Sequence, residues 1–234
     1  MNNPISYQCQ GPVAVIRMDD GKANALSPTM LGALGEALDR ASTEARAALL
    51  LGRPGRFSAG FDLKVMMTSP TAAADLVRSG GELFLRLLLH PQPLVVGITG
   101  HALAGGILLA ACGDLRIATR GDFKLGLNEV SIGLPVPILA HELARLRLDP
   151  RRLEEATLRG GTYTPDEAQQ VGWVDRVSEP ETLEADALKA AEQLVPIAGG
   201  HYALTKQTMR GPTVAYIRET MEQNLQAFAA LSRR

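Results

Sequence analysis

Residues 94–113 read LVVGITGHALAGGILLAACG and combine three kinds of local pattern. The apolar run Leu94–Ile98 is typical of a buried strand, and glycines follow it at 100, 105 and 106. The paired glycines open a second apolar run, which predicts a helix that ends near Gly113. A glycine-containing loop is therefore expected to lead from the end of a buried strand into the first turn of a helix.

A similar alternation extends over the first two thirds of the chain. Apolar and β-branched runs predict strands, and apolar residues at helical spacing predict helices. The predicted strands are 13–18, 47–51, 94–98 and 115–118, and the predicted helices are 27–41, 76–88 and 105–112. Thr164-Pro165-Asp166-Glu167 has the composition of a capping box, and the chain is mostly helical after Pro180. The pattern predicts an α/β fold with a helical C-terminal region.

The bulk properties exclude several classes. The chain has 234 residues, of which 46% are hydrophobic, and a formal net charge of -1. These values suit a globular protein with a sizeable core, and they provide no basic face for nucleic acid. The N-terminus lacks the features of a signal peptide, and no apolar run is long enough to cross a bilayer. We therefore expect no nucleic-acid partner, no membrane partner and a cytoplasmic location. Cys9 and Cys112 lack metal-ligand spacing and are both expected to be buried.

Two glycine-containing loops follow predicted strands. They are RFSAGFDL at 56–63 and TGHALAGG at 99–106, and neither has the spacing of a dinucleotide fingerprint or a P-loop. Glycines let a backbone approach a ligand closely, and the first turn of a helix carries N–H groups without intrahelical partners. Such a loop can stabilise a developing oxyanion. One loop alone would be better explained by a tight strand-to-helix turn.

Together, the two loops resemble the oxyanion-hole motifs of the crotonase (enoyl-CoA hydratase/isomerase) superfamily. The segments CGDLRIA at 112–118, LGLNEVSIGL at 125–134, and TPDEA and GWVD within 164–175 also resemble the family in order and spacing. The resemblance runs from the first strand to about Val177. It implies a crotonase-like spiral of ββα units over 1–178 and a helical trimerisation region over 179–234. It also implies a homotrimer or a dimer of trimers.

The resemblance implies a site for an acyl-CoA. The thioester oxygen would bind between the backbone N–H groups of Phe61 and Gly105, and the Phe61 ring could also wall the acyl channel. Coenzyme A would enter as part of the substrate, so no separate cofactor and no metal is implied. Glu129 matches a catalytic glutamate of the family. The other residues implied to bind substrate are Ser58, Ala59, Gly60, Asp62, Leu63, Leu108, Ile132, Leu134 and Pro135.

Leu108 stands where hydratases of the family carry their other catalytic glutamate. Leucine cannot accept a proton or hold a water, whereas one carboxylate can move a proton between two carbons. The pattern resembles the Δ3,Δ2-enoyl-CoA isomerases, in which Glu129 would carry a proton from C2 to C4 through a dienolate. A dry site beside Leu108 is expected to raise the pKa of Glu129. The alternatives are a hydratase with another second polar group, other thioester chemistry such as hydrolysis or decarboxylation, and an inactive acyl-CoA-binding protein.

Further polar side chains are weaker candidates. Asp62 is expected to cap or form a turn beside the first donor, and His101 is expected to be packed or hydrogen-bonded. The remaining candidates are His141 and Glu142 for a second polar group, and Lys64 and Lys206 for the coenzyme A phosphates.

Overall fold

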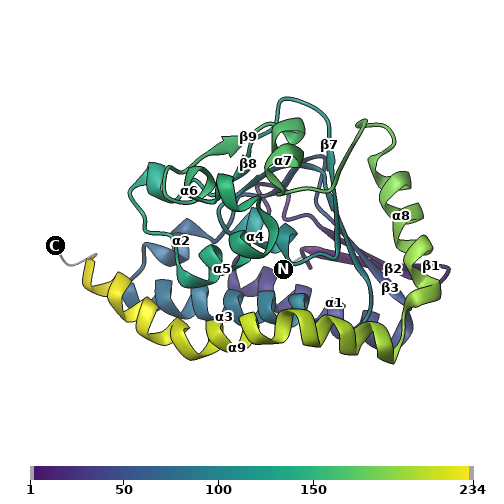
Figure 1. Cartoon of the computed structure of the whole chain (residues 1–234), viewed down its shortest axis with the longest axis horizontal. Coiled ribbons are helices and arrows are strands. Elements are labelled where there is room, and N and C mark those ends of the chain that lie inside the picture. Colours follow the sequence, from purple (N-terminus) through teal and green to yellow (C-terminus); the bar gives the residue numbers. More distant parts are fainter. Residues whose placement is uncertain (1–2, 232–234) are drawn as a thin grey trace.

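The computed structural model describes residues 3–231, and side chains as far as Ala227. Two β-sheets form its centre, and helices cover them (Figure 1). The six-stranded sheet has the order β1-β2-β3-β5-β7-β10, and the four-stranded sheet has the order β4-β6-β8-β9. The strands are β1 Ile5–Gln10, β2 Val13–Met18, β3 Ala47–Leu51, β4 Gly55–Ser58, β5 Leu94–Ile98, β6 Gly100–Leu103, β7 Leu115–Thr119, β8 Leu125–Gly126, β9 Thr162–Tyr163 and β10 Arg176–Ser178.

From β3 to β8, consecutive strands alternate between the two sheets. The strands β3, β5 and β7 lie in the larger sheet, and the strand after each of them, β4, β6 or β8, lies in the smaller sheet. Helical segments follow each pair, which produces the predicted spiral of ββα units. The helices are α1 Pro28–Glu44, α2 Leu63–Met66, α3 Pro70–Leu88, α4 Gly105–Ala111, α5 Ile138–Arg147, α6 Leu153–Ala156, α7 Pro165–Val171, α8 Leu183–Leu194 and α9 Gly200–Leu231. The predicted α/β class with a helical C-terminal region is confirmed.

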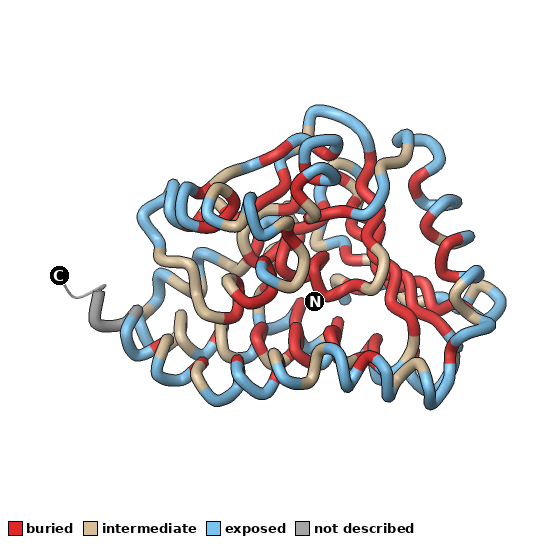
Figure 2. Tube along the Cα trace, viewed as in Figure 1, coloured by how far each residue is buried: buried red, intermediate tan, exposed pale blue. Residues whose placement is uncertain are grey.

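The central strands are buried on both faces, which explains their continuous apolar sequences. Every residue of β3 and β5 is buried (Figure 2). Leu50 and Val96 belong to the main core, whereas Leu49 and Val95 belong to a smaller cluster with Ala187 of α8. Alternate side chains of one strand therefore anchor helices on opposite faces of the sheet.

Capping side chains start several helices where the sequence predicts. Ser27 Oγ accepts a hydrogen bond from the Met30 amide at the start of α1. Thr164 and Glu167 form both halves of the predicted capping box before α7. Helix α3 starts at Pro70, capped by Ser69, and so begins earlier than the predicted residue 76. The Ser-Pro pair is the helix-start signal that the apolar periodicity alone did not reveal.

Helix α9 packs lengthwise against the core and contacts α3 and α5 (Figure 1). Two of its cations form ion pairs with one partly buried acid, because Lys206 Nζ lies 2.6 Å and Arg210 Nη1 lies 2.8 Å from the Asp114 carboxylate. Lys206 also donates to the backbone oxygens of His90 and Gln92. The expectation that Lys206 meets coenzyme A phosphates is therefore wrong, since this lysine is buried and its ammonium is occupied.

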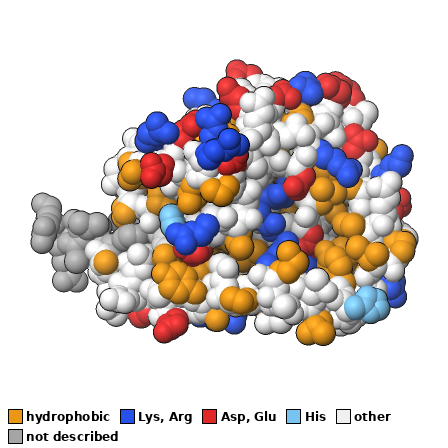
Figure 3. Space-filling view, viewed as in Figure 1, with side chains coloured by type: hydrophobic (Ala, Val, Ile, Leu, Met, Phe, Trp, Pro, Cys, Tyr) orange, Lys and Arg blue, Asp and Glu red, His pale blue; other side chains and the backbone are white. Residues whose placement is uncertain are grey.

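Part of α9 carries exposed apolar side chains. Leu204, Met209 and Tyr216 are exposed, and Figure 3 shows hydrophobic side chains gathered over this helix, with charges of both signs elsewhere on the same face. Exposed apolar side chains on a long helix are suited to contact with another chain.

The two cysteines differ in their exposure to solvent. Cys112 is buried, as expected, but the expectation that Cys9 is buried is wrong. Cys9 lies on β1, an edge strand with only one neighbour in the sheet, so part of this strand faces solvent. Among the described helices, none has both the length and the apolar character needed to cross a membrane.

Candidate active site

The two predicted loops lie against each other at the edge of the smaller sheet. A Cβ atom at Gly60 would lie only 3.0 Å from the Gly105 nitrogen and 3.0 Å from Ala104 Cβ. Leu26 fixes the first loop, since its amide donates to Gly60 O at 2.8 Å and its oxygen accepts from Asp62 N at 3.3 Å. Gly60 has a φ of +91°, so both its conformation and its surroundings require glycine.

The backbone N–H groups of Phe61 and Gly105 are available to a ligand. Leu26 pairs with the residues on either side of Phe61 and leaves the Phe61 amide outside the ladder. Gly105 is the first residue of α4, where amides have no intrahelical acceptor. Within residues 3–231, neither amide donates a hydrogen bond to another protein atom. Two unpaired amides from touching loops are suited to hold one oxygen atom.

Ala104 has an unusual backbone conformation immediately before the second amide. Its φ is 50° and its ψ is -127°, a region that non-glycine residues rarely adopt. Such a conformation costs on the order of 1–3 kcal/mol and is found most often at functional sites. Because ψ of Ala104 sets the plane of the next peptide, it also sets the direction of the Gly105 N–H.

Asn24 braces the first loop and was missed by sequence reasoning. Its side-chain nitrogen lies within hydrogen-bonding distance of the oxygens of Met18, Arg56 and Phe57, at 3.0–3.2 Å, and the residue is fully buried. Ser58 continues the brace, because its hydroxyl donates to Asn24 O at 2.7 Å and accepts from the Gly60 amide. An asparagine three residues after the turn glycine Gly21 was the available signal, but two of its three acceptors, Arg56 and Phe57, lie on β4, more than thirty residues along the chain.

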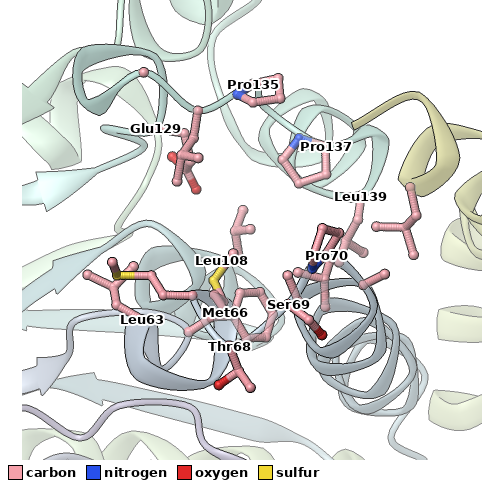
Figure 4. Close-up of a pocket in the computed structure, with 18 of the residues that line it drawn as sticks. Leu63, Met66, Thr68, Ser69, Pro70, Leu108, Glu129, Pro135, Pro137 and Leu139 are labelled. Carbon is pink, nitrogen blue, oxygen red and sulfur yellow. The ribbon is translucent and has the colours of Figure 1, made fainter. Parts of the chain in front are cut away.

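A cavity of about 860 Å³ opens beside Phe61. Its wall is mostly apolar, and Glu129 is the one charged side chain among the described residues that line it. Figure 4 shows Glu129 and Leu108 pointing toward each other across this cavity. The lining residues are Phe61, Leu63, Met66, Met67, Thr68, Ser69, Pro70, Ala73, Ala74, Val77, Leu108, Glu129, Val130, Gly133, Leu134, Pro135, Pro137, Leu139 and Leu225.

Glu129 is a buried acid without a counter-charge. Glu129 lies three residues after the end of β8 and is only 8% exposed. Its Oε2 atom has no hydrogen-bond partner among the described residues. Burial raises the pKa of Glu129 to about 7, because the charged form loses its hydration. A carboxylate with such a pKa can both accept and return a proton near neutral pH. The expected upward shift is therefore reproduced by the structure.

The structure gathers some of the predicted substrate-binding residues and separates others. Leu63, Leu108, Leu134 and Pro135 line the cavity together with Phe61. Ile132 does not line the cavity and is 54% exposed in the 3₁₀ turn Val130–Ile132. The other predicted residues, Ser58, Ala59, Gly60, Asp62 and Gly105, form the two loops rather than the cavity wall.

The weaker polar candidates lie outside the cavity. Asp62 caps α2 by accepting from the Lys64 amide, as expected. His101 accepts from the Lys124 amide and packs edge-on against Phe123, as expected for a structural histidine. His141 and Glu142 face each other at 3.2 Å in a separate pocket between α5 and α9. They do not supply a second polar group beside Glu129.

Tertiary structure also added wall residues that sequence reasoning did not name. Leu139 of α5 and Leu225 of α9 both reach the cavity, whereas Met66 and Val77 lie in the segment 65–90 that was expected to shape the acyl pocket. The apolar character of Leu139 and Leu225 gave no sign of this role, because core leucines look the same in a sequence.

The ββα spiral and the two touching loops with unpaired amides are features of the crotonase superfamily of enzymes. The family model of enoyl-CoA hydratase/isomerase matches residues 8–234. The human mitochondrial enoyl-CoA delta isomerase 1 is 34% identical over 223 residues, which cover 93% of this chain and 74% of the human protein. The chain belongs to the enoyl-CoA hydratase/isomerase family.

Solved structures of relatives have the same fold. The human mitochondrial delta3-delta2-enoyl-CoA isomerase superposes with a TM-score of 0.92 at 31% identity, over 97% of this chain and 91% of that chain. An enoyl-CoA hydratase from Mycobacterium marinum superposes with a TM-score of 0.91 at 37% identity, over 96% of this chain and 99% of that chain. The overall fold is thus shared by relatives named for two different reactions.

Proposed function

We propose that the protein isomerises 3-enoyl-CoA to 2-enoyl-CoA, with Glu129 as the single acid–base group. The observation that carries this proposal is the unpaired, buried Glu129, which faces Leu108 in an otherwise uncharged cavity. The similarity to the human isomerase supports it further.

The proposed reaction begins with the thioester oxygen between the Phe61 and Gly105 amides. Glu129 takes a proton from C2, and the electrons of that C–H bond spread over the thioester oxygen, C2 and C4. The two amides stabilise this dienolate, since they can donate to the oxygen as its negative charge develops. Glu129 then returns the proton to C4, so the double bond moves from C3–C4 to C2–C3. Each step uses groups of the protein and the substrate, and coenzyme A enters within the thioester.

An uncharged wall opposite Glu129 favours isomerisation over hydration. Hydration of 2-enoyl-CoA requires a water held on the correct side of the double bond, normally by two polar groups. Among the described residues that line the cavity, the one opposite Glu129 is Leu108, and His141 and Glu142 lie in another pocket. An inactive binding protein is also disfavoured. Burying a carboxylate with no partner lowers the stability of the fold, and such groups are found mainly at functional sites.

Paired assays on 3-enoyl-CoA and 2-enoyl-CoA test the proposal. We expect isomerisation by the native protein without added metal, and little hydration. Glu129→Gln keeps the shape of the side chain and removes the base, so isomerisation should fall by at least about 10²–10⁴-fold. Rapid hydration that survives Glu129→Gln would overturn the proposed mechanism.

We also propose that the protein assembles as a homotrimer or a dimer of trimers. The exposed apolar residues Leu204 and Met209 of α9 support an assembly that buries this helix. Sedimentation equilibrium measures the mass directly. A monomer at micromolar concentration would contradict this proposal.

A further inference from the structure

We propose that Gly80 of α3 positions the oxyanion hole by leaving room for the Phe61 ring between α3 and the start of α4. The inference rests on the proposed function, in which the Phe61 amide is one of the two oxyanion donors. Gly80 would be a positioning residue, since its role is exerted through Phe61.

The Phe61 ring fills the space between α3 and the start of α4. A Cβ atom at Gly105 would lie 3.2 Å from Cδ2 and 3.3 Å from Cε2 of this ring. A Cβ atom at Gly80 would lie 2.2 Å from Cε1 and 2.6 Å from Cζ. Opposite edges of one ring therefore face the two glycines. The ring is wedged between the helix that carries Gly80 and the loop that carries the second donor.

Other contacts limit where the ring could move. Phe84, one turn further along α3, stacks on the ring with a centroid distance of 6.0 Å and an interplanar angle of 27°. The Leu26 side chain occupies the region beside Gly105, and the Leu26 backbone pairs with the first loop. The remaining open side is the cavity, which the substrate would fill.

A methyl group at position 80 would therefore displace the ring. No side chain tolerates a neighbour at 2.2 Å, and the clash involves a rigid ring rather than the end of a flexible chain. Because the ring is clamped on its other edge, its displacement should shift the Phe61 backbone and misalign its N–H. Hydrogen bonds to an oxyanion are stronger in the transition state than in the ground state, so the loss should appear in kcat.

The neighbouring glycine provides a matched control. A Cβ atom at Gly81 would lie 2.9 Å from Sδ of Met221, which is part of a flexible side chain, and 3.4 Å from Leu139 Cδ2. Gly81 does not touch Phe61. Gly80→Ala and Gly81→Ala bring the same gain in helix propensity within one helix, so they differ mainly in their contact with the ring.

A double-mutant cycle tests the positioning role. Steady-state isomerase kinetics would compare the native protein with Gly80→Ala, Gly81→Ala, Phe61→Ala and the double variant Phe61→Ala/Gly80→Ala. We expect Gly80→Ala to lower kcat at least about tenfold with KM changed less than about twofold. Gly81→Ala should stay within about twofold of the native kcat, and Gly80→Ala should have little further effect once the ring is absent. Thermal unfolding of each variant reports whether it is folded.

An infrared readout separates this inference from the proposed reaction. The carbonyl stretch of a bound, carbonyl-labelled 2-enoyl-CoA falls in frequency when two amides donate to it, whether or not the protein is an isomerase. We expect Gly80→Ala to reduce that shift and Gly81→Ala to preserve it. Turnover in the native protein with an unchanged kcat and carbonyl shift in Gly80→Ala would overturn the positioning role alone. Absent turnover with a Gly80-dependent carbonyl shift would overturn the isomerase proposal alone. Equal losses in both glycine variants, or a loss that persists without the ring, would also overturn the positioning role.

Discussion

Leu108 and Glu129 face each other across the cavity, one from α4 and the other from the segment after β8 (Figure 4). The leucine is 1% exposed and its methyl groups exclude both charge and water from the position opposite the acid. This arrangement leaves one proton-transfer group in the cavity and raises the pKa of that group. In the proposed mechanism, the choice between isomerisation and hydration depends on this uncharged residue opposite the acid.

Leu108→Glu should replace part of the isomerase activity with hydratase activity. A second carboxylate opposite Glu129 can hold a water, but the two like charges would also compete for one proton. We expect measurable hydration of 2-enoyl-CoA and a fall in isomerisation of at least about tenfold. Leu108→Gln, which has the same shape without the charge, is the control. If Leu108→Glu shows native isomerisation and no hydration, the facing position does not govern the reaction.

The rate should depend on pH through Glu129. Burial raises the pKa of this acid to about 7, and the ionised form is the base. Hence kcat/KM should rise with pH, reach half its maximum near pH 7 and level off above it. A pH–rate profile on 3-enoyl-CoA measures the midpoint. A midpoint near ~4.3, the value of an ordinary glutamate, would show that burial does not act on the base as inferred.

Glu129→Gln should stabilise the protein at alkaline pH. The folded state holds the proton more tightly than the unfolded state, with pKa values of about 7 and 4.5 respectively. Raising the pH through this window therefore lowers the free energy of unfolding, by about 3 kcal/mol once the pH exceeds 7. Urea unfolding should find the variant more stable by up to that amount at pH 8, with no difference near pH 4. A variant that is less stable at pH 8 would contradict the account.

Asn24→Asp should weaken both the fold and the reaction. The change keeps the shape and tolerates the positive φ of 50°, but it turns a donor toward three carbonyl oxygens into an acceptor. We expect a loss of about 2–4 kcal/mol in unfolding free energy and a lower kcat, because the first loop loses its brace. Asn224→Asp is a control for stability, since there the side-chain oxygen is the bonded atom and is retained. Equal effects of the two changes would remove the special role of Asn24.

Ala74→Leu should shorten the acyl chain that the cavity accepts. Pro70, Ala73, Ala74 and Val77 line it at helical spacing, so a larger side chain there enters the space from α3. Activity on long 3-enoyl chains should fall more than activity on short ones, by about fourfold for each methylene that is excluded. Ala72→Leu, on the same helix but facing the groove against α1, is the matched control. A uniform loss at all chain lengths would indicate misfolding rather than selection.

Local patterns in the sequence were enough to predict four strands of the larger sheet, the helix caps at Ser27 and Thr164, and the two glycine-containing loops. The resemblance to the family, rather than a local pattern, pointed to the Phe61 and Gly105 amides and to Glu129. Strand burial, capping and glycine-dependent turns are short-range properties, and each leaves a readable pattern within a few residues. The same resemblance explained why Leu108 matters, since hydratases of the family carry a glutamate at this position.

Other features were decided by tertiary packing alone. Ile132 and Leu134 are two residues apart and both partly exposed, yet only Leu134 lines the cavity. Leu225 of α9 joins the wall of a cavity whose acid lies in a distant segment, and Asn24 finds its acceptors on other strands. The wedge of Phe61 between Gly80 and Gly105 is likewise a contact among three separate elements. Such contacts, and the loss of hydration that shifts the pKa of Glu129, depend on distances between residues far apart in the chain, which no local pattern records.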